Sequence, residues 1–146
     1  LVPAATVGTD ARYAEQFMTP GRLTDWFNRS WYAGGGSSSA RMVPTRGYVA
    51  PPLDGVWATA PYLHNGSVPT LAALLDSRQR PVRWRRDHAS DVYDLRAVGW
   101  PYALGTAGDA QTYDTTLPGY RSSGHTYGDA LDAAQRGALL EYLKTL

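Results

Sequence analysis

Apolar residues recur at helical spacing in only a few short stretches of this chain. The clearest stretch lies at the C-terminus, where Asp132 can act as the N-cap of a helix and Gln135 completes a capping box. Four leucines then fall on one face of that helix: Leu139, Leu140, Leu143 and Leu146. This pattern predicts a C-terminal helix that packs its leucine face on a core.

Two short helices are predicted near the N-terminus. Thr9 or Asp10 can cap a helix that runs through Phe17. The aromatic-rich residues 24–32 favour one or two further helical turns. Residues 34–40, which read GGGSSSA, are typical of a flexible linker.

The middle of the chain favours little regular structure. Ser67 and Pro69 suit the start of a short helix, and three leucines follow at helical spacing: Leu71, Leu74 and Leu75. Residues 77–130 show no sustained period. A structureless stretch of this length is unusual in a compact domain, so we expect it to pack on a large cofactor or a partner domain. The predicted fold is mostly irregular, with a few short α-helices.

Composition narrows the function classes. The chain has 146 residues, 43% of them hydrophobic, and no apolar run near the ~20 residues of a membrane helix. Its formal net charge of +1 gives no electrostatic footprint for nucleic acid. It has no cysteine, which excludes disulfides, thiolate catalysis and covalent haem attachment within this chain. The first residues, LVPAATVGTD, lack the features of a signal peptide, as a mature or excised segment also would.

Residues 47–76 are the most informative stretch. They read GYVAPPLDGVWATAPYLHNGSVPTLAALLD, in which proline and glycine predict a shaped loop. The stretch resembles the PYLHNGSVPTL signature of bacterial di-haem c-type cytochromes of the cytochrome c peroxidase and MauG superfamily, and most of all the branch of RoxA-type rubber oxygenases. VGTDARYAEQF, at 7–17, and YDTTLPGYRSSGHTYG, at 113–128, resemble further segments of that family in the same order.

The resemblance implies a cofactor and a partner. Haem c in this family is attached through CxxCH motifs, and this sequence contains none. Residues 1–146 would then form a single C-terminal segment of an all-α, cytochrome c-like di-haem protein. That segment would pack on a haem-bearing portion of the same original polypeptide, in the periplasm or in a secreted protein. The whole would be a haem-dependent redox protein, with electron transfer, peroxidase-like or dioxygenase-like chemistry as its function, and any oxidoreductase activity would need both portions.

Three histidines are the candidate metal ligands. By resemblance, His125 is the distal axial ligand of a bis-histidine haem; the alternative is a loop histidine bonded to a backbone carbonyl. His64 resembles a residue beside the haem, near its edge or propionates, although it could simply brace its loop. His88 has polar neighbours and is expected to be exposed. The three histidines have no compact spacing that would suit zinc.

Aromatic and basic residues add weaker candidates. Trp57 and Tyr62 lie within residues 47–76 and would line a haem edge, where they could move electrons. Five arginines are expected to form a solvated basic face, from which one or two could instead pair with a haem propionate: Arg78, Arg80, Arg83, Arg85 and Arg86.

Two other function classes stay open. The chain could be a non-catalytic structural or interaction module without haem contact. It could also bind aromatic or sugar ligands, a hypothesis that rests on its ten tyrosines and five tryptophans. No hydrolase or nucleotide-binding motif is present. Sparse helices and the lack of cysteine predict that the chain folds poorly without a partner.

Overall fold

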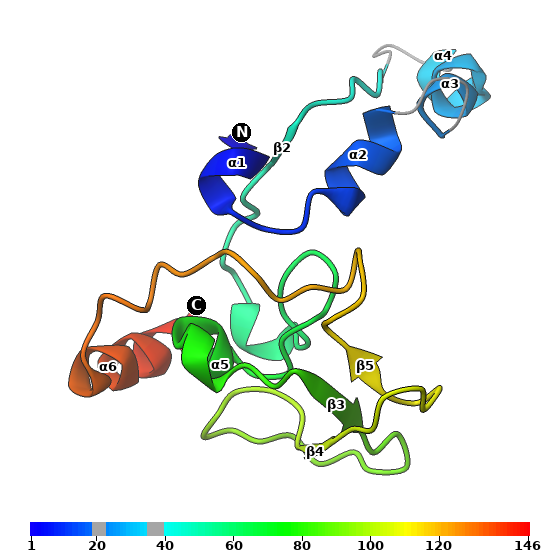
Figure 1. Ribbon diagram of the computed structural model, residues 1–146. Helices are drawn as coiled ribbons and strands as arrows, with labels where there is room; N and C mark the ends of the chain where they lie inside the picture. Colours follow the sequence, from blue (N-terminus) through cyan, green and yellow to red (C-terminus); the bar gives the residue numbers. More distant parts are fainter. Residues whose placement is uncertain (19–22, 35–39) are drawn as a thin grey trace. The chain divides into compact units, whose positions relative to one another are not determined.

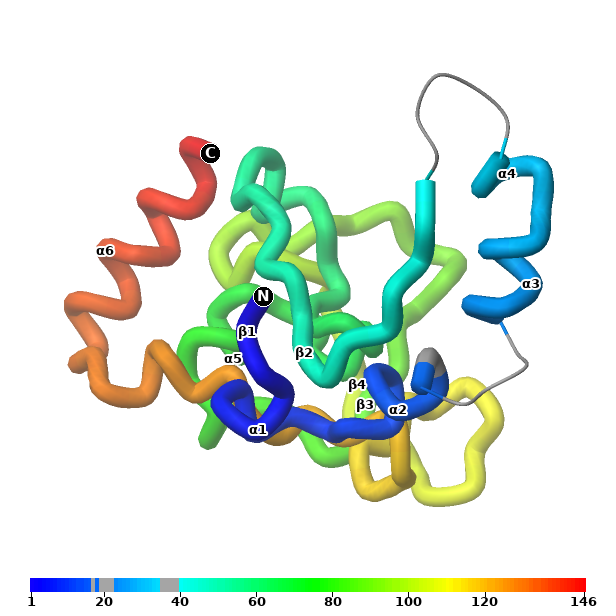
Figure 2. Tube along the Cα trace, turned by 90° about the horizontal axis from the view of Figure 1, so that it is seen from above, coloured from blue at the N-terminus to red at the C-terminus, as the bar shows by residue number. Residues whose placement is uncertain are grey.

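The computed structural model describes residues 1–18, 23–34 and 40–146. These residues form two compact units, one made of Leu1–Val7 and Ala11–Ala50, the other of Gly8–Asp10 and Pro51–Leu146. Figures 1 and 2 trace the chain through both units.

The first unit contains short helices and one small sheet. Strand β1 (Val2–Pro3) pairs antiparallel with β2 (Gly47–Tyr48). The helices are α1 (Ala4–Val7), α2 (Arg12–Met18), α3 (Leu23–Arg29) and α4 (Trp31–Gly34). Helix α2 confirms the helix predicted through Phe17, and α3 and α4 confirm the turns predicted over 24–32. The predicted linker includes residues 35–39, which lie outside the described residues.

The second unit holds the remaining elements. Its helical elements are η1 (Val56–Ala58), α5 (Leu71–Leu75), η2 (Ser77–Gln79) and α6 (Ala133–Leu143). Its strands are β3 (Arg83–Arg86), β4 (Tyr102–Leu104) and β5 (Tyr113–Asp114). They form an antiparallel sheet in the order β4-β3-β5, with Trp84 opposite both Leu104 and Tyr113. Figure 1 shows α5 and α6 side by side in this unit.

The prediction of a mostly irregular fold with a few short helices is confirmed, but the sheets were not foreseen. The stretch 77–130 was expected to lack regular structure, yet it contains β3, β4 and β5. In β3 only Trp84 is buried, so the strand has too few apolar residues to show a two-residue period. An all-α class is therefore not what the described part of this chain shows.

The two helices of the second unit match their predicted faces. In α6, Asp132 accepts from Gln135 N and the Gln135 side chain accepts from Asp132 N, which confirms the capping box. Leu143 of α6 is part of the core, and Leu139, Leu140 and Leu146, the last of them beyond the end of the helix, pack against it. Helix α5 is capped by Thr70, whose hydroxyl accepts from Ala73 N, and not by Ser67 or Pro69 as expected. Within the described residues, no helix is both long enough and apolar enough to cross a membrane.

The core surrounds an irregular segment, residues 67–70, that is buried throughout. These residues belong to no helix or long strand, so their buried backbone N–H and C=O groups need hydrogen-bond partners from other parts of the chain. Tyr62 N and Val68 N each donate to the other residue's carbonyl, at 2.7 and 3.3 Å. The Trp84 indole donates to Ser67 O at 3.0 Å, and Trp100 N donates to Pro69 O at 3.3 Å.

Asp76, only 4% exposed, connects α5 to α6. Its carboxylate accepts from the Arg78 guanidinium at 2.8 and 3.0 Å and from the Gln79 amide at 3.1 Å. The guanidinium of Arg136, on α6, lies 3.6 Å from the same carboxylate. The hydrogen bond from Arg78 is the main cause that holds the pKa of Asp76 well below its ordinary value.

We expect Asp76→Asn to destabilise the protein at neutral pH, because the amide cannot accept from all three partners. The carboxylate has a lower pKa in the folded state than the ordinary 3.8, so its stabilisation is present above that value and lost as the pH falls further. The difference in unfolding free energy between wild type and variant should therefore shrink below about pH 4. Urea denaturation at a series of pH values measures it. Asp91→Asn, at an exposed position, is the control. A difference that stays constant with pH would contradict the assignment.

Candidate functional site

A tight turn presents His64. Gly66 N donates to Leu63 O at 3.1 Å, and both Leu63 and Gly66 have positive φ, 67° and 69°. The Asn65 amide donates to Gly119 O at 3.1 Å and to Arg121 O at 3.0 Å. The turn is thereby fixed to the segment that leads into the second histidine.

A second irregular loop presents His125. Gly124 and His125 both have positive φ, 75° and 50°. The Arg80 guanidinium donates to Gly124 O at 2.7 Å and to His125 O at 2.8 Å, which holds the backbone on both sides of the histidine. Tyr127 lies edge-on to the imidazole, with ring centroids 6.4 Å apart.

The two loops bring His64 and His125 together. Their ring centroids are 6.4 Å apart and their planes are tilted by 41°. The Nε2 atom of His125 is buried and has no hydrogen-bond partner among the described residues. An uncommitted buried nitrogen is costly unless something outside these residues uses it.

Both imidazoles favour the neutral form. Burial is the main cause that lowers the pKa of His64, and the nearby Asp10 carboxylate opposes that shift. Burial also lowers the pKa of His125, with further contributions from His64 and the Arg80 charge. Neutral imidazole is the form that binds a metal. Asp10, expected as a possible helix cap, accepts from Gly119 N at 2.6 Å beside this pair.

The described residues do not build a complete site for a free metal ion. Among them, no cluster of three or more histidine, cysteine or acidic side chains could hold one. A pair of imidazoles without further protein ligands suits a metal that already has most of its coordination from another source.

The remaining candidates lie in different surroundings. Tyr62 is buried in the core and its hydroxyl donates to Val56 O at 3.2 Å, while burial raises its pKa strongly. Trp57 is 41% exposed, and its carbonyl accepts from the Tyr93 hydroxyl. His88 is exposed, as predicted. The structure thus pairs His64 with His125 and gives Tyr62 a structural contact.

The interpretation of the arginines as one solvated face is wrong for three of them. Arg80 bonds backbone carbonyls, Arg83 pairs with Asp114 at 2.7 Å, and Arg86 lies 3.2 Å from the centroid of the Trp100 ring. The sequence could not predict the partners of Arg80, because every residue has a backbone carbonyl and a bond to one leaves no pattern in the sequence.

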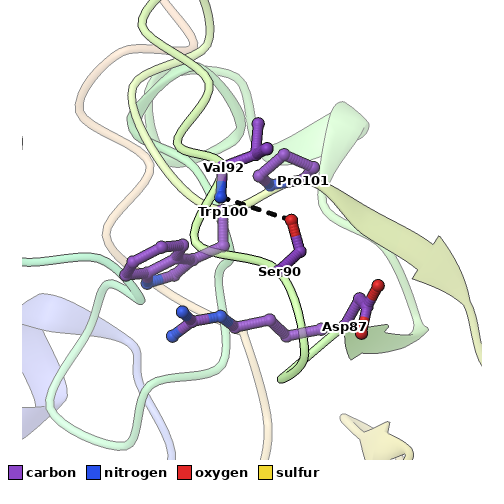
Figure 3. A pocket seen from close by; sticks show the side chains of 6 residues that line it. Asp87, Ser90, Val92, Trp100 and Pro101 are labelled. Atoms are coloured by element: carbon purple, nitrogen blue, oxygen red, sulfur yellow. Dashed lines mark hydrogen bonds between the residues drawn. The ribbon is translucent and has the colours of Figure 1, made fainter.

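The side chain of Arg86 lines a pocket of about 250 Å³. Figure 3 labels five other residues that line it. It is lined by Arg86, Asp87, Ser90, Val92, Trp100 and Pro101. The Arg86 guanidinium covers one face of Trp100, and Tyr93 meets the same ring edge-on at 5.1 Å. The indole N–H is used by Ala60 O at 3.0 Å. The Trp100 ring and its N–H are therefore already in contact with other residues of this chain. The pocket gives little support to the hypothesis that the chain binds an aromatic or sugar ligand.

Comparison with known proteins supports a haem-related chain. Residues 47–85 match the family described as RoxA-like, cytochrome c-like. This match supports a cytochrome c-like family and indicates a haem-related redox protein, and it begins at the same glycine as the signature stretch.

Two proteins of Sinorhizobium fredii are similar over a longer region. The uncharacterized protein y4iM is 38% identical over 128 residues, which take in 73% of this chain and 29% of that protein. The uncharacterized protein y4iJ is 39% identical over 109 residues, which take in 68% of this chain and 18% of that protein. The chain thus spans less than a third of either relative.

The turn that presents His64 can be tested with glycine substitutions. We expect Gly66→Ala to destabilise the protein by about 1–2 kcal/mol, because alanine resists positive φ. A Cβ there would also lie 3.3 Å from Pro61 Cγ. Gly137→Ala is the matched control: it lies inside α6 with open space around it, and should stabilise by about 0.5–1 kcal/mol. Urea denaturation measures both, and a shift of the same sign in both variants would count against the turn.

Proposed function

We propose that this chain is part of a haem-dependent redox protein and that His125 supplies the distal axial imidazole of a haem c. The haem would be attached covalently through a CxxCH motif outside this chain. The observation that carries the proposal is the His64 and His125 pair, brought together within a chain whose residues 47–85 match a cytochrome c-like family.

The residues fit such a group. The Nε2 atom of His125 is buried and uncommitted within the described residues, which suits a nitrogen that bonds to iron. Burial keeps the ring in the neutral form that a metal requires. Only one or two ligands are needed from the protein, because the macrocycle supplies the others.

The chain's own residues would have distinct tasks. His125 would bind through Nε2, and the loop around it would hold the imidazole in place. His64 would lie beside the haem edge, where its ring would restrict the angle at which the second imidazole stands. Trp57, which is 41% exposed, would lie toward the haem-bearing portion, whereas the buried Tyr62 would support the loop. A haem with two imidazole ligands supplies one-electron exchange and leaves no open position for a substrate.

The rest of the machinery would lie in the remainder of a longer polypeptide. This chain spans 29% and 18% of the two relatives, which leaves ample length for a haem-bearing portion. Peroxide or dioxygen chemistry, if the protein performs it, would take place at a second haem in that portion. By the same resemblance, the protein would work in the periplasm or outside the cell.

The proposal predicts different effects for the three histidines in the natural haem protein. His125→Ala should convert one low-spin, six-coordinate haem to a high-spin form, with a blue-shifted Soret band and a new long-wavelength band. Its reduction potential should rise, because loss of a basic imidazole disfavours the ferric state. Visible spectroscopy and a redox titration measure these changes.

The other histidines serve as controls. His64→Ala should leave the spin state unchanged and alter only stability or the rate of electron transfer. His88→Ala, at an exposed position, should do neither. A spin-state change in His64→Ala with none in His125→Ala would make His64 the ligand. No change in either variant, or the absence of a Soret band from the natural protein, would favour a structural module without haem contact.

A further inference from the structure

The Arg80 guanidinium has an unusual set of partners. It carries five N–H donors, and all five point to backbone carbonyls. Nε donates to Ala73 O at 3.3 Å, and one terminal nitrogen donates to Ser122 O and Gly124 O at 2.6 and 2.7 Å. The other donates to Leu74 O at 3.1 Å and to His125 O at 2.8 Å.

These carbonyls come from two separate parts of the second unit. Two belong to α5, whose last carbonyls lack partners within the helix. The other three belong to residues 122–125, the loop that carries His125. Arg80 thus connects the end of a core helix to this loop. Lysine could not do so, because it lacks the planar five-donor geometry.

Arg80 is not held there by an acidic partner. Within the described residues it forms no salt bridge, and burial lowers its pKa while the more distant Asp129 charge opposes that shift. A partly buried guanidinium needs acceptors for its protons, so the carbonyls of the loop must stay where they are. The arginine and the loop therefore fix each other.

These hydrogen bonds restrain the backbone of His125. Its φ of 50° is unfavourable for a residue with a side chain, and such a conformation persists only where the surroundings impose it. Arg80 holds the carbonyls of both His125 and the residue before it. Close packing at Gly128 limits the loop further along, since a Cβ there would lie 2.2 Å from Leu75 O. With its backbone fixed in this way, the imidazole can move only by rotation of its own side chain.

We propose that Arg80 is the positioning residue of the His125 ligand: it sets the direction from which the imidazole reaches iron. The inference rests on the proposed function of His125 and adds a residue to it. Arg80 itself contacts neither iron nor haem in this account. Its role is to keep the imidazole oriented before and after each electron transfer.

The test uses the natural haem protein and three variants. Arg80→Ala removes all five donors, and Arg80→Lys keeps the charge but offers at most three. Arg85→Ala is the matched control, because it removes an arginine that lies nearby in the sequence, on β3, and is exposed. Hydrogen–deuterium exchange of the Asp129 and Leu131 amides, which donate to Thr126 O and Gly128 O at 3.0 and 3.2 Å, reports on the loop, and the visible spectrum reports on iron coordination.

We expect Arg80→Ala to speed exchange of these two amides by roughly tenfold or more, since the loop whose carbonyls accept from them loses three hydrogen bonds to Arg80 together. The low-spin fraction of one haem should fall. Arg80→Lys should give smaller changes in both, and Arg85→Ala should give none. Guanidinium ion, added to Arg80→Ala below denaturing concentrations, should restore part of the loop protection and of the low-spin signal.

Two results would overturn the inference. If the Asp129 and Leu131 amides exchange in Arg80→Ala as they do in Arg85→Ala, Arg80 does not hold the loop. If the loop loosens while the spectrum stays low-spin, Arg80 does not position a ligand. His125→Ala in the same preparation separates the two proposals: a spin-state change there with none in Arg80→Ala refutes only the role of Arg80, whereas no change in either refutes the role of His125.

Discussion

The second unit depends on the burial of an irregular segment, residues 67–70. A helix or a sheet satisfies its own backbone, but this segment cannot, so each of its polar groups needs a partner from elsewhere. Trp84 supplies an indole N–H to Ser67, and Trp100 supplies a backbone N–H to Pro69. These requirements fix the strand that carries Trp84 and the stretch that carries Trp100 around the segment, and the apolar side chains of α5 and α6 then close the core.

The candidate site is built from the parts of the chain that precede and follow residues 67–70. On one side the chain leads back to the turn of His64, and on the other it continues through α5 to Arg80. Side chains from both parts then donate to carbonyls of residues 119–125. The Asn65 amide donates to Gly119 O and Arg121 O, and the Arg80 guanidinium donates to carbonyls of the His125 loop. Two histidines far apart in the sequence meet because backbone carbonyls between residues 119 and 125 are held from both sides.

The sequence predicted the parts of the fold that have a local signal. The C-terminal helix was visible in its capping box and leucines, and the signature stretch indicated a cytochrome c-like relationship that residues 47–85 support. The sheet was missed because Trp84 is the one buried side chain of β3. Arg80 was misread as part of a solvated face because long-range bonds to carbonyls leave no spacing in the sequence. His64 and His125 were named from resemblance, and their proximity came from the structure.

The central claim is that His125 reaches haem iron from this chain. Diffraction from crystals of the natural haem protein, recorded at the iron absorption edge, tests it most directly, because the anomalous difference map locates each iron independently of the spectrum. We expect one iron at coordination distance from the Nε2 atom of His125, with His64 beside the haem and not bonded to it. An iron bonded to His64 instead, or no iron near either imidazole, would contradict the account.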